Sequence, residues 1–371
     1  MKRSNPAVRA LFVSNGYAED LIAAEIIRHL PGAEITAYPL VGTGAYPPDV
    51  RLLDPRRTLP SAGFAFRAGL RGLGADLRAG VIGLWVAQRA TLARWYGHAD
   101  LVVAVGDTYC LWMASTAAPR VAFVSTADSV RIAPFGFLAR VGLRRFAARV
   151  FARDHETAAA LRRLGVPADC LGNVMMDLVR PRGATFPVPP DAPVVALLPG
   201  SRHDAPDNAA VLAQAARAVA AAVPEVRFLM VLAPTISEDG VRARLPETPA
   251  IHVTTAFADA VARAALVMGF AGTAHEQAAG MGRPVVAFPS RGPQFSPAFL
   301  AAQARLLGDA LITTRTWQEA AAAAVRLLRA PAERERRGAA GRALMGPPGA
   351  AARIAAALAE MAREGPGRKA S

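Results

Sequence analysis

Lysine is nearly absent from this chain of 371 residues: Lys2 and Lys369 are the only two, although the formal net charge is +14. Arginine therefore carries almost all of the positive charge, and the accompanying excess of alanine and glycine is also what a GC-rich genome produces. If the charge is functional, it suits nucleic acid, an anionic membrane surface or a phosphorylated substrate. Composition alone does not choose among these.

Cysteine is also scarce. Cys110 and Cys170 are too few for a disulfide framework, and their spacing is not that of metal ligands. No apolar run is long enough to span a membrane, and the basic, briefly apolar start of the chain lacks the long apolar core and the cleavage site of a signal peptide. We therefore expect a cytoplasmic protein.

Aromatic residues make up only 6% of the sequence, but 53% is hydrophobic, which is ample for a globular core. Short apolar runs recur between longer helical patterns. Runs in which apolar and polar residues do not alternate are typical of strands buried on both faces of a parallel sheet. The sequence therefore predicts the α/β class, with two Rossmann-like domains that face a cleft. Predicted strands span 9–14, 33–39, 101–106, 121–125, 194–200, 227–234, 266–270, 284–289 and 310–313.

A proline-rich stretch without periodicity, 179–193, predicts a linker. It separates an N-terminal domain, 1–180, from a C-terminal domain, 181–348. The remaining segment, 349–371, contains an amphipathic pattern that predicts a tail helix, packed back on the N-terminal domain or on a partner subunit. Ligands of open α/β sheets bind beyond the carboxyl ends of the strands, so we look for a site there.

One glycine turn lies in "FAGTAHEQ", where a predicted strand ends and a predicted helix begins. Gly272 lets the backbone approach a ligand, and the first amides of the helix are unpaired donors at its positive end, which suits a diphosphate. Glu276, one turn further, could accept hydrogen bonds from ribose hydroxyls. The same residues also form a capping box, in which Thr273 caps the helix and Glu276 bonds back to it.

A second glycine turn, "LLPGSRHD", ends another buried strand at Gly200. Ser201 and Arg202 follow in a loop before the next helix. A guanidinium placed there can donate two parallel hydrogen bonds to a phosphate. The alternative is an ordinary surface arginine in an arginine-rich chain.

A third turn, Ser14-Asn15-Gly16, follows the first predicted strand and precedes a helix with Glu19 and Asp20 in its first turn. These carboxylates are candidates for a general base, although helix capping is the alternative because the dipole favours negative charge at that end. The turn is not G-x-G-x-x-G, which argues against NAD.

Asp107 comes directly after a buried strand and before a helix. It is a candidate general base whose pKa partial burial would raise, or else an N-cap. Asn173, in "LGNVMMD" at the domain border, is a candidate loop residue or a structural turn. The sequence has no Asp-x-Asp motif, so we expect no metal.

Together "LLPGSR", "GTAHEQAAGMGRPVV" and "LGNVMMD" resemble lipid-A-disaccharide synthase, and more narrowly its uncharacterised relatives, in which "SNGxxED" opens the chain and "GPQF…AQ" closes the site. The resemblance covers most of the chain. It implies the glycosyltransferase-B fold and an inverting, metal-independent and cofactor-free transfer from a UDP-sugar, of the N-acetylhexosamine type, to a lipid-linked acceptor. It also implies a possible homodimer. The chain departs from the true synthases at Asn173, where they have histidine, and in "SNGYAED", where they have a "GExSGD"-type turn.

The resemblance assigns acceptor binding to 1–180 and nucleotide-sugar binding to 181–348. Within the second domain it implies that Arg202 holds the diphosphate and Glu276 the ribose. Asp107 falls at a catalytic aspartate position, although the identity of the base stays open between it, Glu19 and Asp20. The complete predicted set is Gly200, Ser201, Arg202, Gly272, Thr273, Glu276, Gln277, Gln294 and Gln303 for the nucleotide sugar, and Ser14, Asn15, Gly16 and Asn173 for the acceptor loop.

The segment 61–97 is predicted to face a membrane. At helical spacing, one stripe of it is apolar, and a neighbouring stripe combines arginines with Trp85. Apolar, cationic and tryptophan side chains together suit a membrane interface. The alternative is a core-facing helix with a solvated basic flank. We therefore expect peripheral association with the anionic inner face of the cytoplasmic membrane.

Two other functions fit parts of the sequence. A UDP-sugar 2-epimerase would share the fold and the nucleotide site, without needing an acceptor. A basic nucleic-acid-binding protein would explain the charge, but the arginines are not interleaved with stacking aromatics and no recognition motif is present. We therefore expect no nucleic acid partner.

Overall fold

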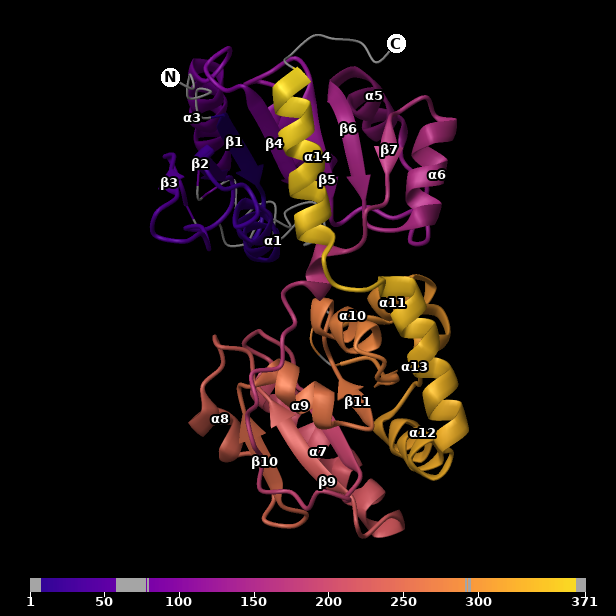
Figure 1. Cartoon of the computed structure of the whole chain (residues 1–371). Helices are drawn as coiled ribbons and strands as arrows, with labels where there is room; N and C mark the ends of the chain where they lie inside the picture. Colours follow the sequence, from indigo (N-terminus) through magenta and orange to yellow (C-terminus); the bar gives the residue numbers. More distant parts are fainter. Residues whose placement is uncertain (1–7, 58–77, 79, 291, 293–294, 365–371) are drawn as a thin grey trace, which may run out of the picture. The chain divides into compact units, whose positions relative to one another are not determined.

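The computed structural model describes residues 8–57, 78, 80–290, 292 and 295–364. The chain forms two compact units (Figure 1). Unit 1 comprises Met1–Leu178 and Pro348–Ser371, and unit 2 comprises Val179–Pro347. Both are parallel α/β sheets with alternating helices, so the predicted fold class is confirmed.

Unit 1 contains a seven-stranded parallel sheet, sheet A, with strand order β3-β2-β1-β4-β5-β6-β7. Its inner strands are almost wholly buried, which explains why they appear in the sequence as apolar runs without alternation. The strands are β1 Arg9–Ser14, β2 Glu34–Pro39, β3 Arg51–Leu52, β4 Leu101–Gly106, β5 Val121–Ser125, β6 Ala147–Ala152 and β7 Ala168–Asp169.

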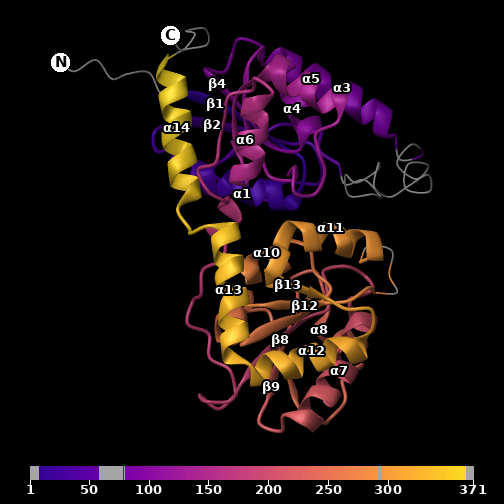
Figure 2. The ribbon, with the colours of Figure 1, turned by 90° about the vertical axis from the view of Figure 1, so that its right-hand side faces the viewer.

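Helices cover both faces of sheet A, because successive strand residues point to opposite sides. Leu11 of β1 packs in the core under one helical layer, and Phe12 packs in the core under the other. Figure 2 shows α14 on one side and α3, α4 and α5 on the other. The helices of unit 1 are α1 Tyr17–Ile27, α3 Val81–Arg94, α4 Thr108–Ala114, α5 Phe137–Phe146, α6 His155–Arg163, η1 Val174–Met176 and α14 Ala350–Glu364.

The last helix, α14, belongs to unit 1 although it follows unit 2 in the sequence. The Asp177 carboxylate accepts hydrogen bonds from the amides of Gly349 and Ala351, the second at 2.8 Å, and so holds the start of α14. The helix buries Ile354 and Leu358 in the same core as α1. The chain is thereby tied back to its first half.

Unit 2 contains a six-stranded parallel sheet, sheet B, with order β10-β9-β8-β11-β12-β13. Its strands are β8 Val194–Leu198, β9 Arg227–Val231, β10 Ile251–Thr254, β11 Leu266–Gly269, β12 Val285–Ala287 and β13 Leu311–Thr313. Its helices are α7 Ala205–Ala222, α8 Glu238–Arg242, α9 Phe257–Arg263, α10 Thr273–Gly280, α11 Pro297–Leu307, η2 Gly308–Ala310, α12 Trp317–Arg329 and α13 Pro331–Met345.

Each of the nine predicted strands corresponds to an observed one, but β3, β6, β7 and β10 were not predicted. Strand β6 is instructive, because α5 ends at Phe146 and β6 begins at Ala147 without an intervening loop. No turn residue separates the two patterns there. Among the described helices, none combines the length and the apolar character needed to cross a bilayer.

Two of the sequence predictions fall wholly or partly on residues outside the described ranges. Of the proposed membrane-facing segment 61–97, residues 61–77 and 79 lie outside, and α3 represents most of the remainder. Gln294 also lies outside the described residues.

Candidate functional site

Each sheet has one point at which the order of its strands reverses. In sheet A the chain runs from β1 outward to β2 and β3, and then returns to β4 on the other side of β1. In sheet B it runs from β8 to β9 and β10, and then returns to β11 beside β8. In open α/β sheets, ligands bind beyond the carboxyl ends of the strands at such switch points. The four turns that follow β1, β4, β8 and β11, together with the first turns of the helices after them, contain most of the predicted site residues.

In unit 2, the turns after β8 and β11 press against each other. Gly200 has φ +101° and Gly269 has φ +159°, which favour glycine. A Cβ on Gly269 would collide with the Leu198 carbonyl of β8, and one on Gly200 would come within 3.0 Å of the Phe270 carbonyl. These glycines therefore allow the two turns to lie side by side at the switch point.

Helix α10 begins at Thr273, and its N-cap is Gly272. The N-cap position that the predicted capping box gave to Thr273 is thus occupied by Gly272, which has no side chain to accept a hydrogen bond. Thr273 is exposed, whereas Glu276 is 8% exposed. The start of α10 thus offers a positive dipole end and backbone amides at the switch point, which suits an anionic ligand.

Gln303 of α11 holds the loop before α10. Its Nε2 donates to the carbonyls of Ala271, at 3.0 Å, and Gly272, at 3.1 Å. Its Oε1 lies 3.1 Å from Nδ1 of His275, which is fully buried. Burial lowers the pKa of His275 to about 4, so the neutral ring donates from Nδ1 to this oxygen. We therefore interpret Gln303 as a positioning residue for the loop rather than a sugar ligand.

The turn after β8 is also anchored from its neighbours. Asn208 of α7 donates from Nδ2 to the Pro199 carbonyl at 2.9 Å, and Thr235 donates to the Ser201 carbonyl at 3.2 Å. Arg202 is exposed at this anchored turn. The guanidinium therefore projects from a fixed backbone at the edge where a ligand is expected.

In unit 1, the turns after β1 and β4 are bonded to each other. Asn15 donates from Nδ2 to Oδ1 of Asp107 at 2.7 Å. The same oxygen accepts from the Cys110 amide at 3.1 Å, so Asp107 is the N-cap of α4. Gly106, with φ +149°, is needed because a Cβ there would collide with Asn15. The capping alternative for Asp107 is thus observed, and its second oxygen is not part of these contacts.

Glu19 and Asp20 are neighbours in α1 but have different surroundings. Burial raises the pKa of Glu19, and the nearby charge of Asp107 adds to the shift. One oxygen of Glu19 accepts from Thr126 at 3.3 Å. A carboxylate with a raised pKa beside a second carboxylate is a general-base candidate.

Asp20 is enclosed by its partners and is 1% exposed. Ser14 donates to one of its oxygens at 2.6 Å, and the Ala45 amide donates to the other at 3.1 Å. Tyr46 in turn lies 2.7 Å from the Ser14 hydroxyl. Asp20 therefore fixes the loop that follows β2, and we regard it as a positioning residue.

Asp20 should make the stability of unit 1 depend on pH. Burial raises its pKa to about 6, from an ordinary value near 3.9, so folding favours the protonated form. The stabilisation is complete below about pH 4 and is lost as the pH rises through 6, an effect of ~3 kcal/mol. We expect Asp20→Asn to remove this dependence, measured as urea unfolding of both proteins at pH 4 and 7.5. Parallel pH curves for the two proteins would contradict it.

The remaining predicted loop residue of unit 1, Asn173, is 6% exposed and caps η1 by accepting from the Met175 amide at 3.1 Å. This contact fits the structural-turn alternative. Thr126, which was not predicted, donates to Glu19, and its carbonyl accepts from Arg153 at 2.8 Å. Its position directly after β5, at the same sheet edge, was the available signal.

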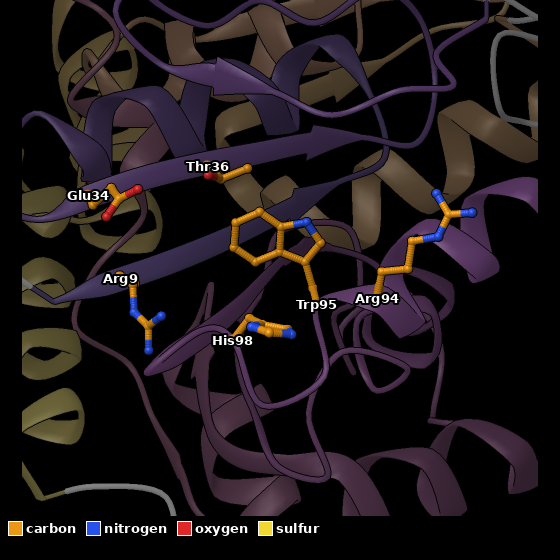
Figure 3. Close-up of a pocket in the computed structure, with 6 residues that line it drawn as sticks. All are labelled: Arg9, Glu34, Thr36, Arg94, Trp95 and His98. Atoms are coloured by element: carbon orange, nitrogen blue, oxygen red, sulfur yellow. The ribbon is translucent and has the colours of Figure 1, made fainter.

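A surface cavity of about 340 Å³ lies at the other end of sheet A. Figure 3 shows its lining on the first halves of β1 and β2, at the last residue of α3 and in the turn after it: Arg9, Glu34, Thr36, Arg94, Trp95 and His98. Arg9 is already paired with Asp100 at 3.3 Å. The cavity is at the amino ends of the strands, away from the switch point, and we assign it no role. Within the described residues, no cluster of His, Cys, Asp and Glu could hold a metal ion.

Two parallel α/β sheets in separate units, connected by a linker and by a returning C-terminal helix, define the class of the protein: it has the glycosyltransferase-B fold. Solved structures of this fold resemble it over nearly its whole length. A protein assigned as a UDP-N-acetylglucosamine 2-epimerase from Listeria monocytogenes has a TM-score of 0.64 at 16% identity, over 98% of this chain and 100% of that one.

Two further structures show the same likeness. The UDP-GlcNAc 2-epimerase from Neisseria meningitidis, bound to UDP-GlcNAc, has a TM-score of 0.58 at 15% identity, over 95% of this chain and 100% of that one. The calicheamicin glycosyltransferase has a TM-score of 0.59 at 15% identity, over 96% and 99%. Identities this low show a shared fold. No family model and no curated sequence matches the chain.

Proposed function

We propose that the protein is an inverting, metal-independent glycosyltransferase that moves a sugar from a UDP-sugar, of the N-acetylhexosamine type, to a lipid-linked acceptor at the inner face of the cytoplasmic membrane. The observation that carries the proposal is the switch point of sheet B. There two mutually packed glycine turns present Arg202 and the start of α10, whose N-cap is Gly272, at one edge. That combination suits the diphosphate of a nucleotide.

Unit 2 would stabilise the departing UDP. Helix-end amides and one arginine can bind the developing negative charge without a metal ion. Glu276, buried in the first turn of α10, would accept hydrogen bonds from the ribose hydroxyls. Gln303 would keep the Ala271–Gly272 carbonyls in place, so that the amides of α10 stay directed at the ligand.

Unit 1 would supply the general base. Glu19 is the candidate that its surroundings favour, because burial raises its pKa towards the range in which a base works at neutral pH. It would take the proton of the acceptor hydroxyl while that oxygen bonds to the anomeric carbon and UDP leaves with its bonding electrons. Asp107 remains the second candidate, since the resemblance to lipid-A-disaccharide synthase assigns it the catalytic role.

A UDP-sugar 2-epimerase is the second candidate function. Two of the three similar structures above are described as UDP-N-acetylglucosamine 2-epimerases, and at 15–16% identity the fold serves both reactions equally. An epimerase needs the nucleotide site and no acceptor. The acidic groups of unit 1 would serve either reaction, so the site geometry alone does not separate them.

Incubation with UDP-N-acetylglucosamine separates the two functions. We expect no turnover of the nucleotide sugar alone, and release of UDP when membrane lipid extract is added as a source of acceptor. Products are resolved by anion-exchange chromatography and proton NMR. Conversion to the 2-epimer without any acceptor would support the epimerase and reject the transferase.

A further inference from the structure

Three helices on one face of sheet A carry most of the large apolar side chains that the described part of unit 1 exposes. Phe137 and Leu138, at the start of α5, are the most exposed of them, at 71% and 70%. Proteins rarely leave a contiguous group of such side chains in water unless it binds something. The apolar members are Ile82, Trp85 and Val86 of α3, Tyr109 and Trp112 of α4, and Phe137, Leu138 and Val141 of α5. We call them, with the arginines named below, the α3–α5 face.

Contacts between the helices make this one continuous surface. Trp112 of α4 packs over Gly142 of α5, where a Cβ would collide with the indole, and its ring lies 5.4 Å from that of Phe146. Arg89 lies over Trp85 at 5.3 Å within α3. Helix α3 also contacts α4, which carries Tyr109 and Trp112. Figure 2 shows the three helices together on the side of sheet A away from α14.

The charge of the face has one sign. The stretches 81–94, 108–114 and 137–146 contain no Asp or Glu. The exposed cations Arg89, Arg140 and Arg145 stand among the apolar side chains, and Arg145 lies over Phe146 at 5.4 Å. Arginines near an anionic lipid surface are attracted to its phosphates, and tryptophan and tyrosine favour the boundary between headgroups and acyl chains. A protein partner would need a matching acidic and apolar patch, whereas an anionic bilayer supplies both features.

The apolar residues also lie towards one end of the helices. Tyr109 follows Asp107 by two residues, and Phe137 begins the helix that follows the loop after β5. Both therefore stand at the carboxyl edge of sheet A, where Glu19 and Thr126 meet. A surface that covered these residues would border the candidate base.

We propose that the α3–α5 face docks unit 1 on an anionic lipid bilayer, with Phe137 and Leu138 at the acyl boundary and the arginines at the lipid phosphates. This proposal rests on the proposed function, because a lipid-linked acceptor would reach the candidate base from the bilayer. It assigns the docking to α4 and α5 as well as to α3, and so extends beyond the segment that the sequence pattern indicated.

Vesicle flotation of the full-length protein tests the proposal. We expect binding to vesicles of phosphatidylcholine with 30% phosphatidylglycerol, and weak binding to phosphatidylcholine alone. The double variant Phe137→Asp/Leu138→Asp should lower the partition coefficient at least ~10-fold, because it replaces apolar contacts with charges that the surface repels. Arg140→Ala/Arg145→Ala should weaken binding and flatten its salt dependence. The control is Tyr96→Asp, which changes a 59% exposed aromatic beyond the other end of α3.

Thermal stabilisation by UDP, measured on the same proteins without vesicles, distinguishes the two proposals. Stabilisation by UDP without vesicle binding would overturn the docking surface and leave the proposed function standing. Vesicle binding that depends on Phe137 and Leu138, without thermal stabilisation by UDP, would support the docking surface and overturn the proposed function. Equal losses in the Tyr96 control and the double variant would also overturn the docking surface. The docking surface would also be overturned if the wild-type protein were a dimer that does not bind vesicles and the double variant were a monomer. The face would then join two copies of the chain.

Discussion

Glu19→Gln should lower kcat for UDP-N-acetylglucosamine-dependent transfer by roughly 10²–10⁴-fold, the usual contribution of a general base. The substitution keeps the size of the side chain and the acceptor oxygen for Thr126, and it removes the group that can take a proton. The affinity for UDP should stay within about twofold, because the predicted nucleotide contacts belong to unit 2. The measurement is initial-rate kinetics with isothermal titration of UDP.

The matched comparison is Asp107→Asn. Asp107 caps α4 and holds Asn15, and an asparagine oxygen can still accept from Cys110. We therefore expect a smaller loss, of about 10–100-fold, as for a group that positions rather than reacts. The two variants also differ in the pH profile: the rise of kcat with pH that a base of raised pKa produces should persist in Asp107→Asn. A large loss in Asp107→Asn beside a nearly normal Glu19→Gln would transfer the catalytic role to Asp107.

Arg202→Ala should weaken UDP binding about 10–100-fold, which is what the loss of a charge-assisted contact of about 1.5–3 kcal/mol produces. Uridine has no diphosphate, so its much weaker affinity should not change. Arg217→Ala is the control: Arg217 is an exposed arginine on α7 of the same unit, so it tests whether net charge alone matters. Isothermal titration gives the constants. Equal losses for Arg202→Ala and Arg217→Ala would reject the assigned contact.

Glu276→Ala should affect the binding of the ribose, as Arg202→Ala affects the binding of the diphosphate. If the carboxylate binds the ribose hydroxyls, UDP loses about 10-fold in affinity or more, while 2′-deoxy-UDP, which lacks one hydroxyl, loses less. The difference between the two nucleotides is the informative quantity, since a general disturbance of α10 would weaken both equally. An unchanged preference for UDP over 2′-deoxy-UDP in Glu276→Ala would reject the ribose contact.

Local patterns were sufficient for the fold class and for the location of the turns. Apolar runs such as 101–106 and 194–198 are buried on both faces, and their uninterrupted apolar composition predicts that burial. The strands missed were short or, like β6, were joined directly to a helix without a turn residue. The order of the strands, and thus the two switch points, depends on pairing between segments far apart in the chain.

The alternatives that the sequence left open at each turn were decided by distant partners. Thr273 and Glu276 fit a capping box locally, yet the N-cap of α10 is Gly272 rather than Thr273, and Gln303 holds the preceding loop from α11. Glu19 and Asp20 are adjacent and alike in sequence, but Asp20 is enclosed by Ser14 and Ala45, whereas Glu19 accepts from Thr126, directly after β5.

The sequence by itself determined where strands end, where glycine allows tight turns, and which carboxylates and arginines stand beside those turns, because each of these is a property of a few consecutive residues. Only the tertiary structure decided which of these groups hydrogen-bond to distant residues of the chain and how exposed each one is. Hydrogen bonds such as that from Asn15 to Asp107 and that from Thr126 to Glu19 join residues 92 and 107 positions apart, and no local pattern encodes them. The same holds for the α3–α5 face, whose apolar and cationic side chains meet only after three separate helices have packed on one sheet.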